Sequence, residues 1–330
     1  TTGSGSAKLY NQTGVQAITT QGQNGAGEGI LLRNAGTGAN SVGIINDGTS
    51  QNITVNNATA VRLQGVSGEV DIHSAGTQTI VLQGASSANQ LQIGLATDAG
   101  HSEIAGNSQT ITAGQTGQAG AIAIIAGTAD DRGAGIANDS GLQIVKTTGT
   151  ITLQAGTAPG VAGPDCISTG GVSGGSCAFI GSDGAALQTV SANNIQLSGG
   201  TTGNLNLAVI ANLNPAGSQL LELQGGGDLT LVGGSGGGNG NRALVQAAGT
   251  SQSVTWLAGG DLTMSAGALG TRNSAMLLMN NTVGTQSITG ATGMTLTAGT
   301  SGGGSGAGNR ALISSSASQV LTVGSGGIHL

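Results

Sequence analysis

The residues of this chain that could do chemistry are few, and they lie far apart in the sequence. Its three histidines, His73, His101 and His329, occupy different contexts, although the first two are only 28 residues apart. A metal or acid–base site needs several such side chains to converge. We therefore expect the histidines to lie isolated on the surface.

Carboxylates are the stricter test of an enzyme, because polysaccharide-cleaving enzymes use Asp and Glu side chains that converge on the scissile bond. Asp130 and Asp131 are adjacent in the segment TADDRGAG, and a carbohydrate-active enzyme would be supported if Glu103 converged with them on one face. Asp228 and Asp261 each follow two glycines, so we expect them to stack at exposed turns. The sequence favours a protein that is not an enzyme.

The two cysteines, Cys166 and Cys177, lie in a long excursion of about residues 155–184. A disulfide between them would close a loop of 12 residues and stabilise the fold by about 3 kcal/mol through loop-closure entropy. A metal site would need more ligands than the neighbouring Asp165 offers, and redox chemistry uses the tighter C-x-x-C spacing. We therefore expect a structural disulfide, which favours an oxidising compartment.

Composition excludes several other classes of function. The chain has 8 Lys and Arg residues and a net charge of −6, so it lacks the basic surface that nucleic-acid binding requires. No apolar run approaches the ~20 residues of a membrane-spanning helix. Gly-rich runs such as GGSGGGNGN lack the Gly-Lys-Ser/Thr of a phosphate loop and the Asp of a calcium-binding nonapeptide. We expect no cofactor.

A repeated pattern organises the whole chain and must position these residues. A Gln, one variable residue and an aliphatic residue recur ten times, with successive glutamines 27 to 45 residues apart. The glutamines are Gln16, Gln51, Gln78, Gln109, Gln143, Gln188, Gln219, Gln252, Gln286 and Gln319. Such a period is typical of a solenoid, whose coils share one continuous core, so residues 1–330 are expected to form a single domain.

Each repeat contains three short apolar stretches. The first follows the Gln, the second is an aliphatic–x–aliphatic pair such as Ile122/Ile124, and the third is looser, as in RALVQAAG. Period-2 spacing puts both members of a pair on one face of a strand. Like stretches recur one coil apart between Gly-rich turns. The predicted fold is all-β: a right-handed parallel β-helix of about ten coils, each with ~33 residues and three strands.

The recurring Gln predicts a polar ladder at one corner of the solenoid. Alternation places it on the same side as the aliphatic residue two positions on, where a buried amide must be hydrogen-bonded. We expect the side-chain amides to bond from coil to coil. The ladder is assigned to Gln16, Gln51, Gln78, Gln109, Gln219, Gln252, Gln286 and Gln319.

The two ends of the sequence are in the same phase of the repeat. Residues 7–19 match residues 243–255, and the sequence stops directly after a second stretch. Because open solenoid edges invite strand addition, we expect head-to-tail stacking into a filament. A boundary set by proteolysis, or one that falls within a longer solenoid, is the alternative. The expected interface residues are Leu9, Tyr10, Ile18, Leu321, Ile328 and Leu330.

The segments GGDLTL, GGDLTM and TGTITLQAG resemble the repeats of filamentous-haemagglutinin-type exoproteins, which Gram-negative bacteria secrete by a two-partner route. The resemblance extends over nearly the whole chain. It implies a right-handed parallel β-helix, a location outside the cell or on the bacterial surface, and a role in adhesion or biofilm.

Three functions follow from these observations. The leading hypothesis is a structural extracellular protein that stacks on copies of itself, with surface glycans or host matrix components as further candidate partners. The second is a shaft segment of a large secreted adhesin. The third is a carbohydrate-active β-helix enzyme.

Overall fold

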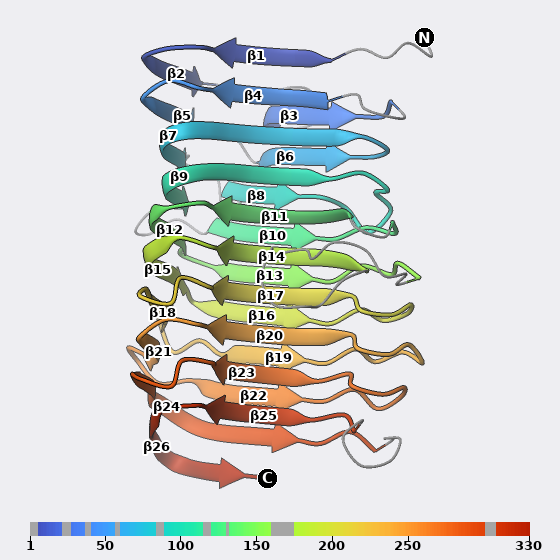
Figure 1. The fold of residues 1–330 in the computed structure, drawn as a ribbon, viewed down its shortest axis with the longest axis vertical. Coiled ribbons are helices and arrows are strands. Elements are labelled where there is room, and N and C mark those ends of the chain that lie inside the picture. The colour runs from blue at the N-terminus through green and yellow to red at the C-terminus, as the bar shows by residue number, and fades with distance from the viewer. Residues whose placement is uncertain are drawn as a thin grey trace.

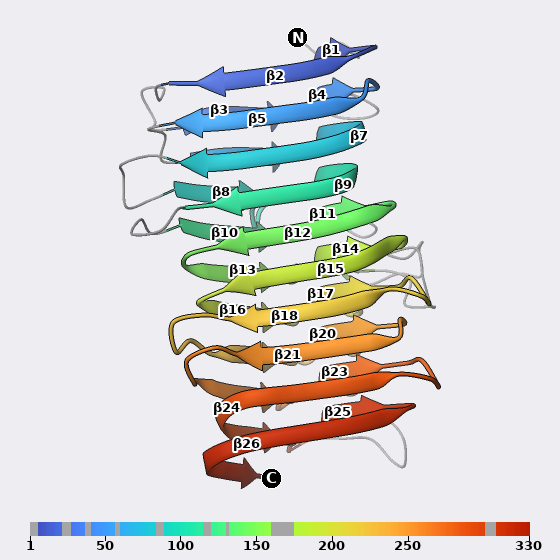
Figure 2. The same ribbon diagram turned by 90° about the vertical axis from the view of Figure 1, so that its left-hand side faces the viewer.

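The computed structural model describes residues 6–21, 28–36, 41–56, 60–83, 89–114, 120–129, 132–159, 175–300 and 308–330. These residues form three parallel sheets that run side by side along one long axis, with β1 and β26 at opposite ends (Figure 1). From one view to the other (Figure 2), the chain passes around the axis as a right-handed coil while it advances from β1 toward β26. The predicted fold, an all-β parallel β-helix, is confirmed.

The first sheet contains the strands that begin near the recurring glutamines. Six strands belong to it alone: β2 (Val15–Thr20), β5 (Ser50–Asn56), β12 (Gly141–Thr147), β15 (Ala185–Ala192), β18 (Ser218–Leu223) and β21 (Ser251–Trp256).

The second sheet contains the strands with the aliphatic–x–aliphatic pairs. Eight strands belong to it alone: β3 (Glu28–Asn34), β6 (Ala60–Gly65), β8 (Asn89–Ile93), β10 (Gly120–Ile125), β13 (Thr150–Gln154), β16 (Asn194–Ser198), β19 (Leu229–Val232) and β22 (Asp261–Ser265).

The third sheet precedes the first in every coil. Eight strands belong to it alone: β1 (Ala7–Asn11), β4 (Ser41–Asn46), β11 (Arg132–Asn138), β14 (Ser176–Ser182), β17 (Leu207–Asn212), β20 (Arg242–Ala247), β23 (Ala275–Met279) and β25 (Ala311–Ser315).

Four longer strands turn a corner and contribute to two sheets. β7 (Glu69–Gln83) and β9 (Ser102–Ala113) pass from the third sheet into the first, and β24 (Thr285–Thr297) and β26 (Ser318–His329) pass from the first into the second. Among the described strands each sheet has ten levels, as the sequence predicts, and eight of these levels have a neighbouring coil on both sides.

In the described pairings, all of which are parallel, each strand pairs with the equivalent strand of the neighbouring coil. In the second sheet, for example, Ile122 lies beside Ile151 of the next coil and Leu91 of the previous one. Alternate residues point inward, so the paired aliphatic side chains stack into one buried core along the axis. The recurrence of the aliphatic pairs in the sequence follows from this stacking.

The excursion expected at residues 155–184 is shorter than the sequence suggested. Its last part, Ser176–Ser182, is strand β14, which pairs with β11 and β17 in the third sheet. Residues 160–174, including Cys166, lie outside the described residues, and so do Asp130 and Asp131. The disulfide and the convergence of those carboxylates with Glu103 therefore stay predictions.

The described residues include no helix that is long and apolar enough to cross a lipid bilayer.

Candidate functional site

The recurring glutamines form one continuous hydrogen-bonded ladder at the corner between the third and first sheets. In each coil the Nε2 group donates to Oε1 of the glutamine in the previous coil, over 2.5 to 3.3 Å. All of them except Gln319 are buried. Gln143 and Gln188, which the sequence did not assign to the ladder, are full members of it.

The Nε2 groups of these glutamines make further hydrogen bonds, which tie the first sheet to the third. Gln188 Nε2 also donates to the carbonyl oxygen of Ala211 over 2.9 Å, and Gln252 Nε2 donates to that of Leu278 over 3.1 Å. Ala211 and Leu278 lie in the third-sheet strand of the following coil, so these bonds also link successive levels, here between the first sheet and the third. Because every Nε2 points toward β1 and every Oε1 toward β26, the ladder has a direction.

A second polar ladder, which sequence reasoning missed, lies where the chain enters the third sheet. Asn206, Asn241, Asn273 and Asn309 are buried, and the Oδ1 atom of each accepts the backbone N–H at the same place in the previous coil over 2.8 to 2.9 Å. Their Nδ2 groups donate to carbonyls of the Gly-rich turns. For Asn241 and Asn309 the signal in the sequence was the "NR" that follows Gly, whereas Asn206 and Asn273 lack this pattern.

Asp228 and Asp261 stack at exposed turns of the second sheet, as expected from the sequence. The Asp261 backbone N–H donates to Asp228 Oδ1 over 2.8 Å, and Asp228 in turn donates its N–H to Asn194 Oδ1. These carboxylates therefore shape turns rather than face each other across a cleft.

The residues expected at an interface lie on the terminal coils. Leu9 and Tyr10 are exposed on β1, while Ile18 on β2 packs against the end of the core. The list for the other end comprises Leu321, Ile328 and Leu330, all exposed, with Leu330 at 96%. Leu9 begins the inward column of the third sheet, because it lies beside the buried Ile44. Its exposure therefore results from its position at the end of the stack.

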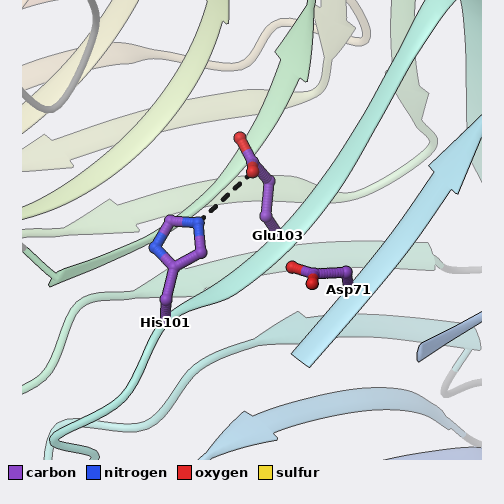
Figure 3. Close-up of side chains that lie close together, drawn as sticks. All are labelled: Asp71, His101 and Glu103. Atoms are coloured by element: carbon purple, nitrogen blue, oxygen red, sulfur yellow. Dashed lines mark hydrogen bonds and ion pairs between the residues drawn. The ribbon is translucent and has the colours of Figure 1, made fainter. Parts of the chain in front are cut away.

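The outer face of the third sheet carries one cluster of titratable side chains. Register places Asp71 of β7 directly beside Glu103 of β9, and His101 lies just before β9. His101 Nε2 is 3.3 Å from Glu103 Oε2, and the ligand atoms of all three residues lie within 4.8 Å of one another. Figure 3 shows the Asp71 carboxylate pointing toward the same space as the imidazole and the Glu103 carboxylate. We call these residues the acid–histidine cluster.

The expectation that the histidines are isolated is therefore wrong for His101. Its ring is three-quarters buried and contacts groups on both sides, because the Gly133 backbone N–H also donates to Nδ1 over 3.3 Å. An accepting Nδ1 means that the neutral ring carries its proton on Nε2, where it donates to Glu103. His329, by contrast, is exposed on the last strand.

Burial and charge act together on this cluster. Burial is the largest influence on the pKa of His101 and lowers it, but the hydrogen bond to Glu103 and the charges of Glu103, Asp71 and Glu69 outweigh burial and raise that pKa. Burial raises the pKa of Asp71, His101 and Lys8 lower it, and Glu103 and Glu69 raise it further. The cluster thus has an excess of negative charge in a partly dry environment.

The acid–histidine cluster belongs to a longer row, which we call the outward column of the third sheet. From the N-terminal coil onward it consists of Lys8, Gly43, Asp71, Glu103, Gly135, Phe179, Val209, Leu244, Met276 and Leu312. Phe179, Val209 and Leu244 are buried in a second apolar cluster outside the main core. The column is therefore polar in its first half and apolar in its second.

Comparison with known proteins gives no relative: no family model, curated protein or solved structure matches the chain.

Proposed function

We propose that the protein is a structural subunit of an extracellular fibre and stacks head-to-tail on copies of itself. The observation that carries this proposal is the directed glutamine ladder. At one end Gln319 is exposed and leaves Oε1 facing away from the stack, since its Nε2 donates to Gln286. At the other end Gln16 Nε2 donates to the Ile45 carbonyl oxygen over 3.3 Å and to no glutamine among the described residues. The acceptor end of one copy matches the donor end of the next.

The apolar ladders support the same polarity. The inward column of the third sheet starts at the exposed Leu9, and the second sheet finishes at the exposed Ile328, which lies beside the buried Met294. Burial of such side chains stabilises an interface by about 25 cal/mol per Å² of apolar area. Stacking of the two ends would bury both sets at once and would pair the open strand edges.

An extracellular role fits the composition and the family resemblance. Only 7% of residues are charged, and the outward positions of the first and second sheets are rich in Thr, Ser, Asn and Gln. Filamentous-haemagglutinin-type repeats, which this sequence resembles, build shafts of surface adhesins. Adhesion to surface glycans or matrix components is the corresponding role of the fibre.

Sedimentation velocity over a range of protein concentrations tests the assembly. The wild-type chain is expected to form species that lengthen with concentration, whereas Leu9→Arg and Ile328→Arg should each prevent this by placing a charge in one of the two end surfaces. Leu142→Arg is the matched control, because Leu142 is 37% exposed on β12, in the middle of the first sheet and away from both ends.

A mixture of the two end variants tests the polarity. Leu9→Arg keeps an intact C-terminal end and Ile328→Arg an intact N-terminal end, so an equimolar mixture should form dimers and nothing longer. Concentration-independent monomers of the wild-type chain would contradict the proposal and would favour the shaft segment of a longer adhesin.

A further inference from the structure

The acid–histidine cluster combines three ligand types in one place for a structural reason. Asp71 and Glu103 occupy equivalent outward positions in consecutive coils, so the parallel register fixes them side by side. His101 reaches the same space from the segment that enters β9, two residues before Glu103. All three positions depend on backbone pairing in the rigid solenoid rather than on a free loop.

Charge around the cluster is unbalanced. Glu69, two residues before Asp71 on β7, adds a third carboxylate whose charge acts on both Asp71 and His101. The only fixed cation that acts on Asp71 among the described residues is Lys8, two coils away. Like charges directly opposite each other on neighbouring strands are destabilising unless a cation compensates them.

An aromatic ring closes one side of the cluster. Gly135 follows Glu103 in the outward column, and a Cβ atom at Gly135 would lie 2.4 Å from Cε1 and Cζ of Phe179. The Phe179 ring therefore covers Gly135 next to Glu103. Such an apolar wall excludes water and strengthens electrostatic interactions beside it.

We propose that Asp71, His101 and Glu103 bind a divalent transition-metal ion, with Zn²⁺ as the best match. One imidazole nitrogen and two carboxylate oxygens are ligands that Zn²⁺ accepts at about 2.0–2.2 Å, and the fourth position would be left to water. Donor atoms around a tetrahedral ion of that size are about 3.3 Å apart. The three ligand atoms, now within 4.8 Å, reach that separation through small rotations of their side chains.

Metal binding has a defined cost in this site. His101 Nε2 must give up its proton to bind the ion, so the proton of the neutral ring moves to Nδ1 and the contact from Gly133 N–H is lost. The contact is long, at 3.3 Å, so its loss should cost little.

Isothermal titration of the purified chain with ZnCl₂ tests the site, which does not depend on the proposed assembly. One Zn²⁺ per chain should bind, and His101→Gln, Glu103→Gln or Asp71→Asn should each weaken binding at least tenfold. His73→Gln is the matched control: His73 lies on β7 two residues beyond Asp71 and takes no part in the cluster. Far-UV circular dichroism checks that each variant keeps its sheet.

A second probe reports coordination directly. Co²⁺ should give visible absorption bands that one equivalent of Zn²⁺ removes, and these bands should be absent in His101→Gln but unchanged in His73→Gln. Absence of saturable binding by the wild-type chain, or equal binding by the His101→Gln and His73→Gln variants, would overturn the proposal. Binding of several Zn²⁺ ions with no loss in any variant would mean adventitious attraction to surface carboxylates and would overturn it too.

Discussion

The two halves of the outward column differ, whereas the inward column beside it does not. In the N-terminal half the outward positions are Gly43, Asp71, Glu103 and Gly135, and in the C-terminal half they are Phe179, Val209, Leu244 and Met276. One residue further along each strand, the inward positions are aliphatic in both halves, namely Ile44, Ile72, Ile104, Ile136, Ile180, Ile210, Val245 and Leu277.

The comparison distinguishes the inward residues that form the core of the rod from the outward residues that vary along its surface. An inward side chain packs on its equivalents in the coils before and after it, so all coils are restricted to similar shapes. Outward side chains lie outside that main core, so their type can differ from coil to coil. The third sheet therefore carries a charged cluster and an apolar cluster on the same backbone, and only the outer surface distinguishes them.

The largest effect is expected at the apolar half. If the second apolar cluster acts as a core, Phe179→Ala should reduce the free energy of unfolding by about 4 kcal/mol, as for a buried aromatic ring elsewhere. Glu103→Gln, in the polar half of the same column, should change it by less than about 1 kcal/mol in the presence of a chelator. Urea unfolding followed by circular dichroism measures both, and similar losses in the two variants would erase the distinction between the halves.

Substitution of a buried ladder glutamine should reduce the free energy of unfolding by the same amount in both halves of the rod. Gln78→Leu and Gln252→Leu each remove the ladder hydrogen bond from the buried amide oxygen of one neighbouring glutamine and from the buried amide nitrogen of the other, at a cost of about 3 kcal/mol. Gln319→Leu, at the exposed end of the ladder, should cost about 1 kcal/mol in the monomer. The same unfolding assay applies, and unequal losses at Gln78 and Gln252 would show that the inside is not uniform.

The sequence predicted the inside of this molecule well because its repeats lie inside. Inward aliphatic residues and glutamines such as Gln188 recur with the coil, and stacking brings each beside its equivalent regardless of turn length. Gln143 and Gln188 carry the same repeat as the eight glutamines assigned to the ladder, so the sequence pattern already includes them. Buried Asn206 and its equivalents were missed because Gly-rich turns of variable length precede them.

The acid–histidine cluster could not be predicted for a related reason. His73 and His101 are 28 residues apart, close to one short coil, but the pairing of β7 with β9 places Asp71 beside Glu103 and His73 beside Ala105. Outward residues have no repeat of their own, so their neighbours follow only from the register of the inward residues beside them, here Ile72 and Ile104.

A smaller effect is expected where the two halves of the column meet. Gly135→Ala would place a methyl group against the Phe179 ring and should cost about 2 kcal/mol through overpacking. In the Phe179→Ala background the same change should cost much less, because the ring is gone. A double-mutant cycle from urea unfolding gives the coupling, and additive losses would mean that ring and glycine do not interact.

The smallest effect is expected at Asp98, a buried carboxylate in a turn of the polar half. Burial raises its pKa, although the Leu95 backbone N–H and the charge of Arg33 lower it. A folded-state pKa above the unfolded one contributes stability that is present at low pH and lost as pH rises through the folded pKa. Asp98→Asn should therefore be slightly more stable than the wild type at pH 7, and the gap should close near pH 4. A constant gap in thermal midpoint from pH 7 to pH 4 would contradict the prediction.

Electron microscopy of the purified chain under native conditions tests the central proposal most directly, with a variant that lacks residues 1–14 beside it. Ten levels spaced ~4.8 Å apart give a subunit about 48 Å long. The proposal predicts filaments with an axial repeat near 48 Å in the wild-type chain and none in the truncated variant. Dispersed short rods in both samples would contradict head-to-tail stacking.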